Sequence, residues 1–529
     1  MDRELETPTP HQPRVAVPGA SSEAAALEEE LAAKLRGEVR FDDGSRALYA
    51  SDLSIYRQPP IGVVIPRDLD DVEFTVDACR RRGVPILGRG TGTSLSGQCC
   101  NVAVVIDFSK YLNRILAVDP ETKRARVQPG VIYDQLKAAI DPHALCFPPD
   151  PATHAYCTFG GMIGNNSCGV HSVMGGRTAD NIAELEVLTY DGLRLRVGAT
   201  SERELEEIIR LGGRRGQLYA RLRALRDRYA PLIRERFPKM PRRVSGYNLD
   251  ELLPERGFHL ARALVGTEST CALVLEATCE LMHNPPKRSL LVVGCPDPFI
   301  AADLVPELRA LGPVGLEAFH EHVIDNMREK GRRPPGAALL PEGETWLLVE
   351  MGGETQDEAH DKAERARALC AGDRRLHARI LDDGTEQEQL WHVRESGVGA
   401  SRVPGVEDAW PSWEDSAVPP ARLGAYLREL DALIRRHDYP YTLFGHFGDG
   451  CVHTRICFKL KTESGVREFR AFIEEAADLV VAHGGSLSGE HGDGQAKGEL
   501  LGKMFGPELV EAFREFKSIW DPDGRMNPG

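Results

Sequence analysis

Short apolar runs and helix-forming segments alternate along most of the chain, a pattern typical of a domain that mixes strands with helices. Residues 63–66, 84–87 and 104–107 are four-residue runs rich in Val and Ile, and each predicts a strand. Residues 24–35 are rich in Ala, Glu and Leu, and they predict a helix, as do residues 70–82.

The pattern continues with strand-like runs at residues 115–119 and 124–127. Two further apolar runs within residues 181–197 are joined by Asp191-Gly192, which is a strong signal for a β-hairpin. Residues 214–236 form a basic helical stretch, which we expect to lie on the surface as an excursion from the domain.

A second region begins after Pro285-Pro286, a pair that favours a domain boundary. Strand-like residues 290–293 and 345–350 alternate there with helical stretches at 299–311 and 354–369. This order predicts an antiparallel sheet backed by helices, as in a ferredoxin-like α+β domain.

Length, charge and cysteine usage narrow the class of protein. A chain of 529 residues favours two or three domains, and a net charge of −15 argues against a nucleic-acid partner. The 12 cysteines include no C-x-x-C pair, so we expect neither a disulfide framework nor an iron–sulfur ligand set. The sequence shows no secretory signal and no apolar run of membrane-spanning length, which predicts a cytoplasmic protein that attaches to the inner membrane, if at all, through a partner.

Two glycine-rich segments predict a site for a dinucleotide. The first follows an apolar strand, and its backbone N–H groups and hydroxyls can surround a diphosphate, although a flexible turn is the alternative interpretation. It matches neither the Rossmann nor the P-loop spacing. Its candidate ligands are Arg89, Gly90, Thr91, Gly92, Thr93, Ser94 and Gly97. The second segment adds Pro149, Asp150, Thr158, Gly161, Gly164, Asn165, Asn166, Ser167 and Gly169.

Two further segments carry histidines among glycines. His446 and His453 flank a Gly-Asp-Gly turn, and Glu490 precedes His491 in a second glycine-rich loop. Two imidazoles and one carboxylate from separate segments predict an open divalent-metal site, whereas isolated histidines are more often core or surface residues.

Several of these motifs occur in the order that one family shows. Residues 89–97, 148–151, 160–169 and 266–268 resemble the FAD-binding domain of the vanillyl-alcohol oxidase/PCMH flavoprotein superfamily. Within it, residues 49–529 resemble the FAD-linked D-lactate, glycolate and D-2-hydroxyglutarate dehydrogenases. The resemblance implies an α+β protein with a disordered tail at 1–22, a PCMH-type FAD domain at 23–285, a ferredoxin-like substrate (cap) domain at 286–484 that carries the metal site, and a helical segment at 485–529 that packs on the FAD domain.

The resemblance also assigns roles to residues. It adds Glu268 and Asn527 to the cofactor-binding set, and it implies non-covalent FAD because Thr93 stands where covalent relatives carry a His. It implies that His446, His453 and Glu490 bind zinc or manganese, and that Arg394 holds the carboxylate of a small anionic hydroxy acid. Arg455 departs from the family pattern, and it is a candidate for binding a second carboxylate, as in D-2-hydroxyglutarate or D-malate, or for replacing another cation.

These roles fit the chemistry of hydroxy-acid oxidation. Removal of hydride from the α-carbon requires the hydroxyl proton to leave as well, and a metal on the hydroxyl oxygen lowers its pKa. We expect His491 to accept that proton, with a hydrogen bond to Glu490 as its alternative role.

Other functions remain open on the sequence alone. A flavin-dependent transferase of the alkyl-glycerone-phosphate synthase type and a non-catalytic flavin electron-transfer subunit are the two alternatives. We expect electrons to pass to a separate iron–sulfur protein, quinone or cytochrome, and a homodimer is possible.

Overall fold

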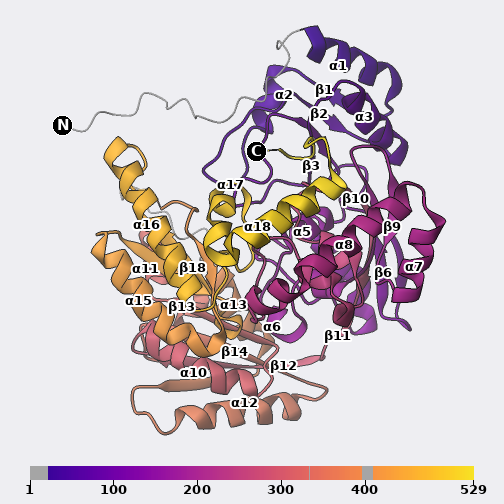
Figure 1. Ribbon diagram of the computed structural model, residues 1–529. Helices are drawn as coiled ribbons and strands as arrows, with labels where there is room; N and C mark the ends of the chain where they lie inside the picture. Colours follow the sequence, from indigo (N-terminus) through magenta and orange to yellow (C-terminus); the bar gives the residue numbers. More distant parts are fainter. Residues whose placement is uncertain (1–21, 333, 396–408, 529) are drawn as a thin grey trace.

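The computed structural model describes residues 22–332, 334–395 and 409–528, and it has two lobes (Figure 1). The N-terminal half builds the lobe drawn from indigo to magenta, and the residues that follow build the pink and orange lobe. The chain then returns to the first lobe through its last helix, which is drawn in yellow. Of the predicted tail, residues 1–21 lie outside the described residues.

A small four-stranded sheet opens the first lobe, with the strand order β1-β2-β4-β3. The strands β2 and β3 run parallel to β4 on either side, and β1 is antiparallel at the edge. Helix α3 begins after Asp68, whose side chain accepts a hydrogen bond from the Asp71 N–H. The elements are α1 (Ser22–Lys34), β1 (Glu38–Arg40), α2 (Asp43–Leu48), β2 (Gly62–Ile65), α3 (Leu69–Arg81), β3 (Ile86–Arg89) and β4 (Val104–Asp107).

A five-stranded antiparallel sheet of order β5-β6-β10-β8-β9 completes the first lobe. The predicted hairpin at residues 181–197 is confirmed as β8 and β9, with Gly192 at a φ of +81° in the turn. The strands are β5 (Ile115–Asp119), β6 (Arg124–Val127), β8 (Ile182–Leu188), β9 (Arg194–Val197) and β10 (Leu273–Glu280), and a separate pair is β7 (Leu145–Cys146) with β11 (Met282–His283). The helices are α4 (Tyr133–Ile140), α5 (Phe159–Asn165), α6 (Ser172–Gly175), α7 (Glu202–Leu211), α8 (Gly213–Arg236) and α9 (Leu260–Leu264).

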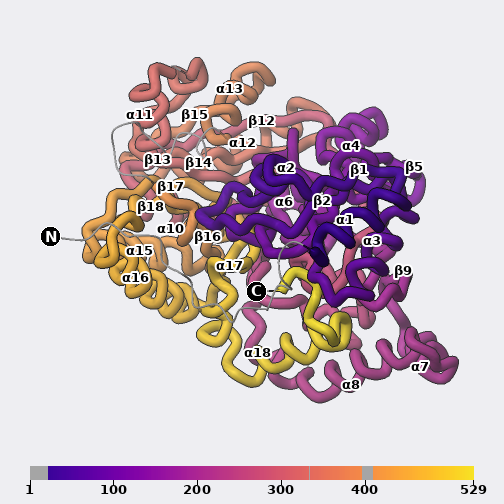
Figure 2. The backbone as a smooth tube through the Cα atoms, turned by 90° about the horizontal axis from the view of Figure 1, so that it is seen from above, coloured from indigo at the N-terminus to yellow at the C-terminus, as the bar shows by residue number. Residues whose placement is uncertain are grey.

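Helix α8 is more deeply packed than the sequence predicts. Most of its arginines face solvent, although Arg226 is buried, and Leu218, Leu222 and Leu225 are buried and belong to the main hydrophobic core. Both views place α8 beside the C-terminal helix α18 (Leu501–Trp520) (Figures 1 and 2). The expectation of a surface excursion is therefore wrong, because the apolar stripe of α8 is covered by α18.

The second lobe contains a seven-stranded antiparallel sheet of order β15-β12-β14-β13-β17-β18-β16. Alternate residues of each strand face opposite sides, so Leu291 and Val293 pack under α10, α12 and α15 while Leu290 and Val292 pack under α11 and α13. The strands are β12 (Lys287–Cys295), β13 (Gly315–His320), β14 (Thr345–Gly353), β15 (His377–Leu381), β16 (Asp415–Ala417), β17 (Tyr441–Gly445) and β18 (Cys451–Ile456). The helices are α10 (Pro298–Ala310), α11 (His322–Glu329), α12 (Gln356–Cys370), α13 (Gly384–Glu395), α15 (Leu423–Arg436) and α16 (Glu463–Ala482).

The C-terminal segment connects the two lobes. A short helix α17 (Gly494–Lys497) leads into α18, which is kinked at Gly506 and packs against the first lobe through aromatic rings. The ring centroids of Phe237 and Phe505 lie 5.1 Å apart, and those of Tyr247 and Phe516 lie 5.3 Å apart. These contacts hold α18 against the first lobe.

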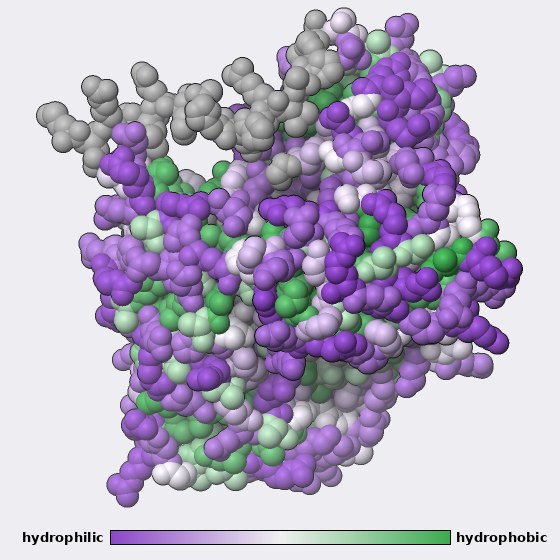
Figure 3. All heavy atoms as spheres, viewed as in Figure 1, coloured by the Kyte–Doolittle hydropathy of each residue, from purple (hydrophilic) through white to green (hydrophobic). Residues whose placement is uncertain are grey.

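Figure 3 shows a face on which hydrophilic residues dominate and hydrophobic ones occur in small separate groups. Among the described residues, no helix combines the length and the apolar character that crossing a bilayer requires.

Candidate active site

The two glycine-rich segments of the first lobe face each other across a cavity. The first follows β3, and the second starts at Thr158, whose hydroxyl caps helix α5 by accepting the Gly161 N–H. Thr91 donates its hydroxyl hydrogen to the Tyr156 carbonyl at 2.9 Å, which ties the segments together. Two adjoining cavities share five lining residues and together run from the small sheet to the second lobe. The predicted cofactor residues that line them are Arg89, Gly90, Thr91, Gly92, Thr93, Ser94, Thr158, Gly161, Gly164, Asn165, Ser167 and Glu268.

Other predicted cofactor residues support these segments from behind. Arg89 lines the second cavity, and its guanidinium donates to the carbonyls of Tyr49, Ser51 and Cys99, so its charge also holds the loop. The side chain of Asn166 is fully buried and accepts the Ala179 N–H, and Gly169 packs against the Asp150 carbonyl. Pro149, Asp150, Asn166 and Gly169 do not line the two cavities.

Asp150 connects the cofactor lobe to the second lobe. His171 Nδ1 lies 2.5 Å from Asp150 Oδ2, and its Nε2 lies 3.0 Å from Oε2 of Glu350 on β14. Burial lowers the pKa of His171, but the two carboxylates more than offset this and raise it well above its ordinary value. A charged imidazole therefore bridges the lobes beside the cavity.

The predicted metal ligands meet at the end of the cavity in the second lobe. His446 follows β17, His453 lies on β18, and Glu490 lies in the loop before α17. Oε1 of Glu490 is 3.1 Å from His446 Nε2 and 3.0 Å from His453 Nε2. One ligand atom from each residue lies within 4.8 Å of the others, so the three can share one ion. Two imidazole nitrogens and one carboxylate suit zinc or manganese.

A buried carboxylate that the sequence analysis missed orients the first imidazole. Glu317 on β13 is 1% exposed, and its Oε1 lies 2.7 Å from His446 Nδ1. Its other oxygen lies 2.7 Å from the Arg394 guanidinium. A carboxylate on the far nitrogen of a metal-binding His is a recurrent arrangement, because it fixes the tautomer and ring orientation. A Glu in the middle of the apolar run of β13 was the only local signal.

A second buried group that the sequence did not indicate is Arg242, which lies beside Glu490. Its side chain is 1% exposed and lies 3.5 Å from Glu490 and 3.4 Å from Asp449. Burial alone would raise the pKa of Glu490, but the imidazoles of His446, His453 and His491 hold it well below the usual value. The low pKa favours the ionised form of Glu490, which is the form that can bind a metal cation.

The predicted substrate groups lie at different depths. His491 and Arg394 line the cavity with the metal-ligand set, and His491 Nε2 is 3.6 Å from Glu490 Oε1. Arg455 is not among the described lining residues, and its Nε donates to Glu414 at 2.6 Å. Glu414 itself lines the cavity, so the structure places a carboxylate where the sequence predicted a guanidinium.

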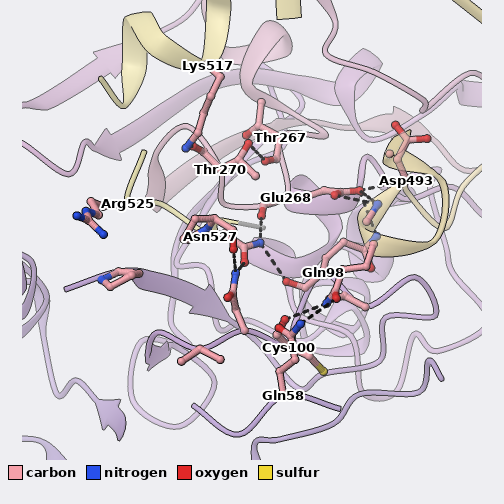
Figure 4. A pocket seen from close by; sticks show the side chains of 18 of the residues that line it. Gln58, Gln98, Cys100, Thr267, Glu268, Thr270, Asp493, Lys517, Arg525 and Asn527 are labelled. Carbon is pink, nitrogen blue, oxygen red and sulfur yellow. Dashed lines mark hydrogen bonds between the residues drawn. The ribbon is translucent and has the colours of Figure 1, made fainter. Parts of the chain in front are cut away.

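A larger cavity of about 1,000 Å³ (Figure 4) adjoins the cofactor cavity, and the residues that line both cavities form the wall between them. Gln98, Thr267 and Glu268 line both this cavity and the cofactor cavity. Two predicted cofactor residues, Gly97 and Asn527, line only the larger one, and the Asn527 amide donates to the carbonyls of Gln98 and Glu268. Asn527 therefore stabilises the backbone of Gln98 and Glu268, two of the residues that separate the cavities.

Fold and cavity together define a two-lobed FAD-binding protein, and comparison with known proteins identifies its family. Residues 60–198 match the FAD binding domain family, and residues 284–529 match the family of FAD linked oxidases, C-terminal domain. The D-lactate dehydrogenase of Archaeoglobus fulgidus is 30% identical over 88% of this chain and 90% of the relative. The chain belongs to the FAD-linked 2-hydroxy-acid dehydrogenase family of the vanillyl-alcohol oxidase/PCMH superfamily, as its motifs predicted.

The share of a relative's length that this chain covers differs between relatives. The D-2-hydroxyglutarate dehydrogenase of Pseudomonas putida is 30% identical over 93% of this chain but only 50% of the relative, so the chain spans about half the length of these curated relatives. The glycolate oxidase subunit GlcD of Bacillus subtilis is 27% identical over 95% of this chain and 96% of the relative.

Solved structures show the same fold at low sequence identity. A p-cresol methylhydroxylase matches with a TM-score of 0.67 at 14% identity, covering 98% of this chain and 97% of that one. An alkyldihydroxyacetonephosphate synthase matches with a TM-score of 0.63, also at 14% identity, over 100% of this chain and 90% of that one. These neighbours confirm the predicted PCMH-type α+β fold. The proposed domain boundaries at 22/23, 285/286 and 484/485 remain predictions.

Proposed function

We propose that this protein oxidises a D-2-hydroxy acid, such as D-lactate, glycolate or D-2-hydroxyglutarate, to the corresponding 2-oxo acid. One observation carries the proposal: a single cavity brings the loop residues that would hold FAD together with His446, His453, Glu490, His491 and Arg394. The names of the relatives support the same substrate class.

Arg394 and His491 would have separate roles, the first in positioning the substrate and the second in proton transfer. Arg394 would hold the substrate carboxylate in bidentate fashion, which fixes the α-carbon relative to the cofactor loops. His491 would take the proton from the substrate hydroxyl, because its ring borders the same cavity as the metal-ligand set. The buried position of these groups excludes bulk water and strengthens each electrostatic contact.

Two bound groups complete the proposal. Non-covalent FAD, held by the segments around Gly90 and Asn165, would supply the acceptor for the hydride. A zinc or manganese ion held by His446, His453 and Glu490 would lower the pKa of the substrate hydroxyl. The residues present fit both groups: the ligand atoms converge, and Glu317 already orients one imidazole.

The electrons are proposed to leave through a separate acceptor, an iron–sulfur protein, a quinone or a cytochrome. Relatives named as a subunit of glycolate oxidase support this arrangement. Slow reoxidation of the reduced flavin by air, compared with turnover in the presence of an added acceptor, is the expected result. Reoxidation by oxygen at the turnover rate would overturn this part of the proposal.

The function is tested by anaerobic mixing of the FAD-loaded, metal-analysed protein with D-lactate, L-lactate, glycolate, D-malate and D-2-hydroxyglutarate. Bleaching of the flavin band by one D-acid (or by glycolate), lost after chelation and in His446→Ala, is the expected result. Absence of bleaching with any acid, while flavin and metal are both present, would favour the transferase reaction instead.

A further inference from the structure

The loop that carries Glu490 and His491 is held by two carboxylates from different lobes. The N–H groups of Gly489, Glu490 and His491 all donate to one oxygen, Asp415 Oδ2, at 2.8, 3.0 and 3.0 Å. The N–H groups of residues 493 and 494 donate to Glu268 Oε1 at 2.9 and 3.2 Å. Five of the six backbone N–H groups from 489 to 494 therefore point at two side chains.

Asp415 reaches the loop from the second lobe. It lies on β16 and is 1% exposed, and its Oδ2 also accepts the Ser488 hydroxyl at 2.6 Å. This one buried oxygen therefore accepts four hydrogen bonds from the four consecutive residues 488–491. A buried carboxylate that accepts several N–H groups binds them strongly.

Glu268 reaches the loop from the cofactor lobe. Its backbone has a φ of +51°, a conformation uncommon for a residue with a Cβ, and this directs the side chain toward the loop. Gln98 braces the contact by donating to Glu268 Oε1 at 3.2 Å and to the His491 carbonyl at 2.6 Å. Figure 4 shows Glu268, Gln98 and Asp493 joined in this way at the wall of the larger cavity.

The loop needs such support because it has little structure of its own. Residues 487–493 include no helix, strand or β-bridge, and Gly492 and Gly494 adopt positive φ values of 82° and 47°. A glycine-rich backbone without regular hydrogen bonds samples many conformations unless external groups fix it. The positions of Glu490 and His491 therefore depend on the groups that bind the N–H row.

We propose that Asp415 and Glu268 are positioning residues that fix the Glu490–His491 loop from opposite lobes, Asp415 setting metal affinity and Glu268 setting the placement of His491. The proposal rests on the proposed function, in which Glu490 is a metal ligand and His491 accepts a proton. It departs from the sequence-based role of Glu268 as a cofactor ligand, because its carboxylate oxygens bond to the loop.

Asp415→Asn tests whether Asp415 sets the metal affinity. The metal dissociation constant of the FAD-loaded protein is measured by competition with a chromophoric chelator. We expect it to rise about 10- to 100-fold, the range typical of outer-shell substitutions. FAD affinity should stay unchanged. Unchanged metal affinity in a folded, FAD-loaded variant would overturn the assignment.

Two substitutions at position 268 test the second half. Burial and the charge of Asp493 raise the pKa of Glu268 to about 8, so a neutral side chain with an acceptor oxygen resembles the native group at pH 7. We expect Glu268→Gln to retain most of the flavin-reduction rate and Glu268→Met, which cannot accept a hydrogen bond, to lower it at least tenfold with little change in metal affinity. Equal behaviour of the two variants would contradict the role of the acceptor oxygen.

Glu251→Gln is the matched control. Glu251 is also a buried carboxylate, at 2% exposed, but it lies in the segment Leu249–Leu252 and lines none of the three cavities. We expect it to leave metal affinity and flavin reduction unchanged, which would show that loss of a buried acid alone is not the cause. Metal binding is measured without substrate, so its result stands even if no hydroxy acid reduces the flavin.

Discussion

The imidazole rings of His453 and His491 lie parallel, with an angle of 3° between their planes and 5.0 Å between their centroids. His453 Nε2 is 3.0 Å from Glu490 Oε1, whereas His491 Nε2 is 3.6 Å from the same oxygen. The two rings therefore lie at different distances from one carboxylate, which fits the proposed roles of His453 as a metal ligand and of His491 as a base.

Because the two histidines lie at different distances from Glu490, we expect their substitution to affect different properties, metal binding for His453 and the rate of flavin reduction for His491. His453→Asn should abolish stoichiometric metal binding, because only two ligands remain. His491→Asn should keep metal and FAD but lower the rate of flavin reduction by about 10²- to 10⁴-fold, the usual contribution of a general base. Elemental analysis and anaerobic stopped-flow measure the two outcomes. If both variants lost the metal equally, His491 would have to be assigned as a metal ligand and not as the base.

The two arginines should differ in their effect on substrate binding. Arg394 lines the cavity, and a Lys in its place cannot form two parallel hydrogen bonds to a carboxylate. We expect Arg394→Lys to raise KM about 10- to 100-fold, which corresponds to one charge-assisted hydrogen bond of about 1.5–3 kcal/mol. Arg455→Lys is the comparison, and its effect on KM for a monocarboxylic acid should be small because Arg455 is paired with Glu414 and is not among the described residues that line the cavity. A larger KM effect at Arg455 would reverse the assignment.

Glycine substitutions should separate cofactor binding from folding. A Cβ at Gly90 would lie 2.2 Å from the Thr158 hydroxyl, whereas one at Gly164 would meet no protein atom within 4 Å and would enter the cofactor cavity. We therefore expect Gly90→Ala to lose both FAD and stability, and Gly164→Ala to weaken FAD binding at unchanged melting temperature of the FAD-free protein. Gly372→Ala, at an open position outside the cavities, is the neutral control. FAD retention after gel filtration and thermal melts report the results, and tight FAD binding by Gly164→Ala would place the cofactor elsewhere.

The His171 bridge predicts a dependence of stability on pH. Its folded pKa lies well above the ordinary value of 6.5, so the protonated bridge contributes its full stability below about pH 6.5 and loses it as the pH rises through the folded value. The difference in melting temperature between the native protein and His171→Gln should therefore be largest near pH 6 and shrink under alkaline conditions. The exposed His143→Gln should follow the native profile. A difference that grows with pH would contradict a charged bridge.

Local patterns in the sequence predicted most strands of the first lobe, β12 and β14 of the second, the β8–β9 hairpin around Gly192 and the glycine-rich loops, because these features depend on residues that are neighbours in the chain. The candidate metal ligands His446, His453 and Glu490 could also be predicted, because they lie in short motifs with a family resemblance. Tertiary structure alone decided which groups support them. Glu317 lies 129 positions before His446, and Glu268 lies 225 positions before Asp493, so no local pattern could pair them. It also decided that α8 is buried against α18 and that Arg455 meets Glu414, because such contacts arise only when separate elements pack and buried charges must find partners.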